Sequence, residues 1–155
     1  MVQQIEILQT VFEPWSYLAH WQQQHVHLGQ SGASAVFVGF MRDFNEGDNV
    51  QALLLEHYPA MTQQQLTQIT QQAIHTWQLN HVLLVHRVGL IHPTEPIVLV
   101  AVYSAHRADA FEACRFMMEQ LKQHAPFWKK EQLADGSTRW VSHNTQGYKL
   151  TSPSE

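Results

Sequence analysis

The sequence predicts an α+β fold with helices on one side of a largely antiparallel sheet. Strand-like apolar runs alternate with helix-like apolar stripes, in the order β-α-β-β-α-β-β-α-β-β. This order mixes hairpin-like and crossover-like connections, which is typical of α+β proteins. The length of 155 residues and the hydrophobic content of 45% suit one domain with a core of its own. We therefore expect a single domain over residues 1–141 and a polar, flexible tail over 142–155.

Strands are expected where β-branched and aromatic residues form short runs or alternate with polar residues. The run SAVFVGFM at 34–41 predicts a buried strand, and the polar segment RDFNEGDN after it predicts a loop. Asp135 and Gly136 predict the turn of a short hairpin, and GLIHPTEP at 89–96 carries turn chemistry. The expected strands are 5–12, 34–41, 50–58, 81–88, 97–103, 128–133 and 138–141.

Three helices are expected from apolar residues that lie three and four positions apart. The first begins at Pro14, which suits a first turn, and stops at Gly29. The second follows a strand that Pro59 ends, and Thr62 with Gln65 fits the spacing of a capping box at its start.

The third expected helix begins after His106 and is stopped by Pro126. It places Arg107 near its first turn, where guanidinium and free N–H donors favour phosphate or carboxylate, although a solvated arginine also fits. Lys122, near its last turn, fits either an anion contact or complementarity to the helix dipole. About four turns separate these two side chains, so a shared site needs walls from different loops or different subunits.

The composition argues against several classes of protein and site. The formal charge of −4 and the pI near 6.2 argue against non-specific nucleic-acid binding, which needs a broad basic surface. No apolar run approaches the roughly 20 residues that cross a bilayer, and the first ten residues do not resemble a signal peptide, so we expect a soluble cytoplasmic protein. The single cysteine, Cys114, is expected to be a small buried hydrophobe, and the spacing of the 11 histidines predicts no metal site.

Positive charge is gathered in one part of the chain. Seven of the nine Lys and Arg residues lie between positions 107 and 149. They are Arg107, Arg115, Lys122, Lys129, Lys130, Arg139 and Lys149. A chain of net negative charge that concentrates its cations in this way is expected to bind an anion there.

The loop after the third helix combines rings with amines. Phe127 and Trp128 precede the two lysines, and these rings either line a pocket for a flat heterocycle or pack in the core. Arg42, at the start of a polar loop, is either a ligand contact or an ordinary strand-end cation. The sequence has no Gly-rich phosphate loop and no serine nucleophile elbow, so an enzyme built on it would take its nucleophile from a substrate or a partner.

Six sequence motifs lie between Ser34 and Val141, a stretch of about two thirds of the chain. The motifs are FVGFMRDFNEGDNV at 37–50, LEHYPAM at 55–61, HRVGLI at 86–91, SAHRADAFEAC at 104–114, LKQHAPFWKKE at 121–131 and RWV at 139–141. With these motifs in this order, the chain resembles the large, catalytic subunit of molybdopterin synthase. One departure is Ala60, where the family often has glycine.

The resemblance implies an α/β-hammerhead-like core with a small added α+β part. It implies conversion of cyclic pyranopterin monophosphate (precursor Z) to molybdopterin by transfer of two sulfurs. These come from the thiocarboxylate on the C-terminal Gly-Gly tail of a small ubiquitin-like sulfur-carrier subunit. It also implies no permanently bound cofactor, and a homodimer that forms a heterotetramer with the carrier. Two alternatives stay open: a non-catalytic module for an anionic pterin or nucleotide, and a dimeric scaffold for a ubiquitin-like protein.

The resemblance also assigns roles to individual residues. Lys122 and Lys129 match the catalytic lysines, and Phe37 with Met118 matches residues that line the pocket or the channel for the carrier tail. Substrate contacts are implied at Phe40, Met41, Arg42, His106, Arg107, Lys130 and Glu131. Of these, the pair at 106 and 107 matches an anion-binding pair, and family sites are completed across the dimer.

Overall fold

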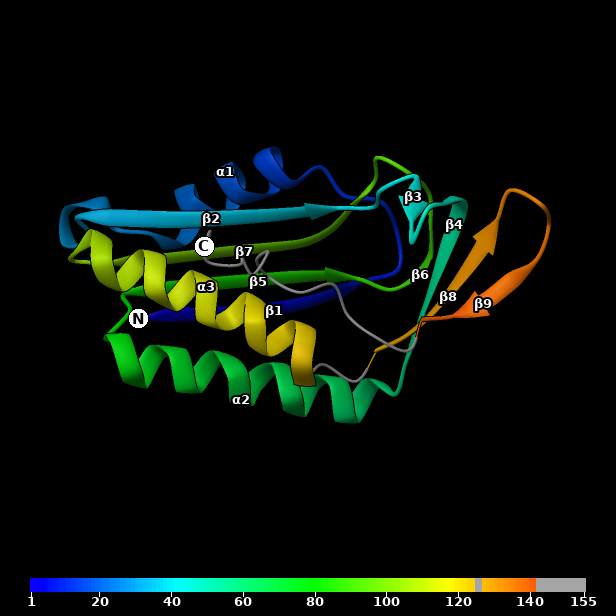
Figure 1. Ribbon diagram of the computed structural model, residues 1–155. Helices are drawn as coiled ribbons and strands as arrows, with labels where there is room; N and C mark the ends of the chain where they lie inside the picture. The colour runs from blue at the N-terminus through cyan, green and yellow to red at the C-terminus, as the bar shows by residue number, and fades with distance from the viewer. Residues whose placement is uncertain (125–126, 142–155) are drawn as a thin grey trace, which may run out of the picture.

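The computed structural model describes residues 1–124 and 127–141, so the expected tail and the helix stop at Pro126 lie outside the described residues. Figure 1 shows a sheet of four long strands, here the larger sheet, flanked by helices, and a sheet of five mostly shorter strands, here the smaller sheet, at one end of it. The helices are α1 (Pro14–His25), a short 3-10 turn (Leu28–Gln30), α2 (Pro59–Trp77) and α3 (Arg107–His124). The strands are β1 (Val2–Leu8), β2 (Ala33–Phe40), β3 (Phe44–Asn45), β4 (Asp48–His57), β5 (His81–Arg87), β6 (Gly89–Ile91), β7 (Pro96–Ser104), β8 (Phe127–Leu133) and β9 (Thr138–Trp140).

The larger sheet has the strand order β1-β5-β7-β2. Only the β1–β5 pair is parallel, so the expected α+β class with a largely antiparallel sheet is confirmed. Leu84 and Val100 face a core formed with α2 and α3, whereas Leu83 and Leu99 face a second core formed with α1. Successive strand residues point to opposite faces, so helices cover both sides. The expectation that all helices lie on one side is wrong.

The smaller sheet joins segments that are far apart in the sequence. Its order is β3-β4-β8-β9, and β6 also pairs with β4. The predicted hairpin at its end is confirmed, because Gly136 adopts a φ of 84° and Asp135 accepts a hydrogen bond from the Ser137 amide at 2.8 Å. Strand β6 lies within the segment 89–96, where a turn was expected.

The second helix begins differently from the expected capping box. Pro59 is its first residue, where a missing N–H costs nothing, and Tyr58 at the N-cap makes no side-chain cap. Thr62 is fully buried inside the helix, and its hydroxyl lies 3.1 Å from Nδ1 of His57. The first helix likewise ends at His25 rather than at Gly29, which lies in the 3-10 turn.

Strand β2 is an edge strand and is not buried as expected. Within the described ranges it pairs only with β7, and Phe37 and Phe40 are 41% and 51% exposed. The described part of the chain therefore leaves these two rings of the apolar run SAVFVGFM partly uncovered. Among the described residues, no helix is both long and apolar enough to span a membrane.

The entry into β2 is fixed by a close backbone contact. A Cβ at Gly32 would lie 2.1 Å from the carbonyl oxygen of Ala105, just before α3. We therefore expect Gly32→Ala to lower the free energy of unfolding by about 1–3 kcal/mol, the usual cost of overpacking, in urea denaturation. Gly29→Ala is the matched control, because a Cβ there meets no atom within 4 Å. Equal losses in the two variants would contradict this account.

Candidate functional site

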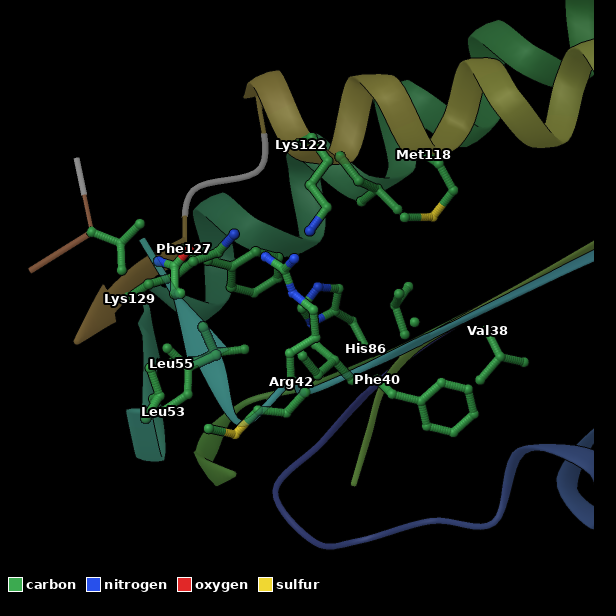
Figure 2. Close-up of a pocket in the computed structure, with 18 of the residues that line it drawn as sticks. Val38, Phe40, Arg42, Leu53, Leu55, His86, Met118, Lys122, Phe127 and Lys129 are labelled. Carbon is green, nitrogen blue, oxygen red and sulfur yellow. The ribbon is translucent and has the colours of Figure 1, made fainter. Parts of the chain in front are cut away.

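A cavity of about 630 Å³ lies where β2, β4 and β8 meet the end of α3 (Figure 2). Its wall is mostly apolar, with cationic side chains set into it. Eight of the residues proposed from the sequence line this cavity: Phe37, Phe40, Met41, Arg42, Met118, Lys122, Lys129 and Glu131. Segments on both sides of the sheet junction thus converge on one site.

Two lysines enter the cavity from different elements. Lys122 projects from the last turn of α3, and Lys129 projects from β8, where it lies opposite Leu55 of β4. Burial lowers the pKa of Lys122, and the positive charge of Arg42 lowers it further, against an opposing effect of Glu119. Burial, together with the charge of Lys122, lowers the pKa of Lys129 to about 8. Burial therefore outweighs the tendency of the helix dipole to keep Lys122 protonated.

Arg42 supplies a third cation from the segment after β2. Its guanidinium carbon lies 5.0 Å from the centroid of the Phe44 ring, a cation–π distance. This contact holds the arginine at the rim while its side chain lines the cavity. The ligand-contact interpretation of Arg42 is therefore favoured over that of a simple strand-end cation.

Glu131 lines the cavity but its carboxylate is already engaged by the protein. It is only 4% exposed, and it accepts hydrogen bonds from Asn45 Nδ2 at 2.6 Å and Arg139 Nε at 2.9 Å. Arg139 also donates to Asp48 at 2.7 Å. This network ties the β8–β9 hairpin to the β3–β4 hairpin. The expected substrate contact of Glu131 stays a prediction, and its bonds indicate a supporting role for the wall that carries Lys129.

Three proposed residues lie outside this cavity in the single chain. Lys130 is on the opposite face of β8, with its amine 5.4 Å from the centroid of the Trp140 ring. His106 and Arg107 are exposed at the start of α3. Fifteen residues of helix place them about 22 Å from Lys122 along the axis. Within one chain they are therefore too far from Lys122 to share its cavity.

The aromatic side chains of Phe127 and Trp128, which follow α3, lie in different environments. Phe127 lines the cavity, which supports the pocket interpretation for this residue. Trp128 is 43% exposed and makes an edge contact with Tyr58 at 4.9 Å. The Phe127 ring stacks on His86, with ring centroids 4.1 Å apart.

Sequence reasoning missed His86 as a site residue. It lies on β5 and lines the cavity, and burial with nearby positive charge lowers its pKa to about 4. The sequence offered little warning, because a histidine in an apolar strand points to a site only once the strand pairing is known. Its place in the motif HRVGLI was the available indication.

The site contains no reactive thiol in its described part. Cys114 is buried on α3, as expected, and burial raises the pKa of its thiol to about 11. No three His, Cys, Asp or Glu side chains in the described ranges are arranged to hold a metal ion. The cavity thus offers amines and a guanidinium in a partly dry setting, which suits binding of anions and transfer of protons.

Comparisons with known proteins agree with this geometry. The family model described as MoaE protein matches residues 12–124. The molybdopterin synthase catalytic subunit of Pseudomonas aeruginosa is 46% identical over 137 residues, which cover 88% of this chain and 89% of that protein. The subunit of the same name from Ralstonia nicotianae is 53% identical over 112 residues, or 72% of this chain, and the match spans 63% of that longer relative.

Solved structures show the same fold. Molybdopterin synthase from Staphylococcus aureus aligns with a TM-score of 0.78 and 30% identity, covering 89% of this chain and 96% of that chain. The molybdopterin biosynthesis MoaE protein from Burkholderia ambifaria aligns with a TM-score of 0.75 and 40% identity, covering 92% of this chain and 91% of that chain. The chain therefore belongs to the MoaE family of molybdopterin synthase catalytic subunits.

Proposed function

We propose that this chain converts cyclic pyranopterin monophosphate to molybdopterin as the catalytic subunit of a molybdopterin synthase. The observation that carries the proposal is one partly buried cavity that gathers Lys122, Lys129 and Arg42. Both the substrate phosphate and a thiocarboxylate are anions, and a low-dielectric site with fixed cations binds such groups more strongly than an exposed one does.

The sulfur source is proposed to be a small ubiquitin-like carrier that inserts its thiocarboxylated C-terminal tail. The thiocarboxylate sulfur would attack a carbon of the pterin side chain and displace an oxygen substituent, and water would then cleave the acyl–sulfur bond and release the carrier as a carboxylate. A sulfur supplied in this way agrees with the inert, buried Cys114. Lys122 would hold the thiocarboxylate or the acyl intermediate. Lys129, with a pKa of about 8, would exchange protons near neutral pH. The proposal includes no permanently bound cofactor and a cytoplasmic location.

A second copy of the chain is proposed to complete the site. The start of β2 lies beside the start of α3, because Gly32 abuts Ala105. The segment after β2 reaches the end of α3, where Arg42 meets Lys122. A twofold partner docked along the open β2 edge would run in the opposite direction, so its Arg107 would approach this Lys122. Such a partner would also cover the exposed rings of Phe37 and Phe40 on β2.

A reconstituted assay tests the proposed activity. The purified chain is mixed with cyclic pyranopterin monophosphate and a thiocarboxylated carrier, and molybdopterin is detected as its oxidised fluorescent derivative. We expect product only when both additions are present. Pterin binding without product would favour a non-catalytic module, and carrier binding that is indifferent to Arg42→Ala and yields no product would favour a scaffold.

The same assay tests the role of the helix-end lysine. Lys122→Ala is expected to lower the turnover rate at least about 100-fold, because it removes a proton-transfer and anion-holding group. Arg115→Ala is the matched control, since it removes a positive charge from an exposed position of the same helix outside the cavity. Circular dichroism and size exclusion establish that both variants are folded. Full activity of Lys122→Ala would contradict the assignment.

Mixed dimers test whether the site is shared between copies. Lys122→Ala and Arg107→Ala chains are each expected to be nearly inactive alone. After subunit exchange, half of the dimers contain both variants and one intact site each, so about a quarter of wild-type activity should return. No recovery, with exchange demonstrated by mass spectrometry, would show that the two residues do not meet across a dimer.

A further inference from the structure

His86 is held in one orientation on the cavity wall. Its ring stacks on Phe127 at 4.1 Å between centroids and 15° between planes. Its Nδ1 lies 2.7 Å from the backbone carbonyl oxygen of Arg87. A carbonyl oxygen can only accept a hydrogen bond, so Nδ1 carries the proton and Nε2 keeps its lone pair.

The lone pair on Nε2 has no protein donor in the described part of the chain. The only hydrogen bond that His86 makes there is the one from Nδ1. Buried, unpaired nitrogens among the described residues include Nε2 of His81 but not Nε2 of His86. Figure 2 shows His86 at the cavity wall, and because Nε2 has no partner in the described chain and is not among the fully buried unpaired atoms, we infer that it is accessible from the cavity.

We propose that Nε2 of His86 accepts a hydrogen bond from an N–H or O–H group on the ring system of the bound pterin. This inference rests on the proposed function, because it names a contact for that substrate. Arg42, Lys122 and Lys129 donate hydrogen bonds and suit the anionic parts of a ligand. A heterocycle that also carries N–H donors needs an acceptor, since a buried donor without a partner weakens binding.

Burial first, and nearby positive charge second, keep this acceptor in its neutral form against the opposing effect of the Arg87 carbonyl. His86 faces Lys129 from β8, Lys122 from α3 and His57 from β4. Burial and these neighbours hold the pKa of His86 near 4, so the ring is uncharged at neutral pH. A neutral imidazole beside Lys122 and Lys129 can therefore accept a hydrogen bond from a donor on the ligand, which complements the anion contacts proposed for the lysines.

Three substitutions of His86 distinguish the loss of its hydrogen-bond acceptor from the loss of ring stacking on Phe127. His86→Phe keeps a flat ring against Phe127 but removes both nitrogens. His86→Asn retains a donor near the Arg87 carbonyl and lacks an acceptor at the position of Nε2. His86→Gln is long enough to return an acceptor oxygen there. His57→Phe is the matched control. The ring centroid of His57 lies 6.2 Å from that of Phe127, but His57 does not line the cavity.

Affinity for cyclic pyranopterin monophosphate is measured by anaerobic calorimetry, alongside the Tm of each variant. We expect His86→Phe and His86→Asn to weaken binding about tenfold, His86→Gln to recover most of it, and His57→Phe to bind as the wild type does. Wild-type affinity in His86→Phe would overturn the proposal. Equal weakening in all three His86 variants with a lowered Tm would assign a purely structural role and overturn it as well.

A nitrogen NMR measurement separates this inference from the proposed function. In the ligand-free protein, ¹⁵N shifts of His86 should show a protonated Nδ1 and an unprotonated Nε2, and added pterin should shift Nε2. A protonated Nε2 in the free protein would overturn the inference whatever the substrate. Wild-type protein that shows the expected tautomer but binds no pterin would contradict the proposed function, and the ligand contact would fall with it.

Discussion

The site depends on holding Lys122 and Lys129 out of water in one cavity. The pKa of Lys129 falls from 10.5 to about 8, which corresponds to roughly 3 kcal/mol against the charged amine. Folding must supply this free energy, because nothing in the unfolded chain imposes it. An anion that enters the cavity would favour the charged form of the amine and would offset part of this cost. The proposed affinity for anionic ligands would therefore follow from the burial of these amines.

Two parts of the fold keep the amines in place. The apolar face of α3, with Met117 fully buried, packs on the larger sheet and fixes the end of the helix that carries Lys122. The β8 strand that carries Lys129 pairs along β4, and Glu131 with Arg139 locks this wall to the β3–β4 hairpin. The cavity is the seam between these two rigid parts, so neither sheet could form it alone.

Local sequence patterns predicted the helices and strands more reliably than they predicted which surfaces of these elements are buried. The stripe of α3, the buried Cys114 and the hairpin at Gly136 depend on nearby residues, and each was found as expected. The burial of β2 was predicted wrongly, because an apolar run does not tell whether its own chain or a second copy covers it. The family resemblance identified eight cavity residues, whereas the role of His86 depends on strand pairing that the sequence does not display.

Titration of the lysine side chains of the free protein by NMR is the most direct test of a site built on buried charge, with Lys122→Ala and Lys129→Ala used to assign the signals. We expect Lys129 to lose its proton at a pH of about 8 and Lys122 to do so below 10.5. Because the charge of Lys122 contributes to the shift of Lys129, the pKa of Lys129 should rise in Lys122→Ala. Ordinary titration of both amines near 10.5 would show that they are solvated and would contradict a site built on buried charge.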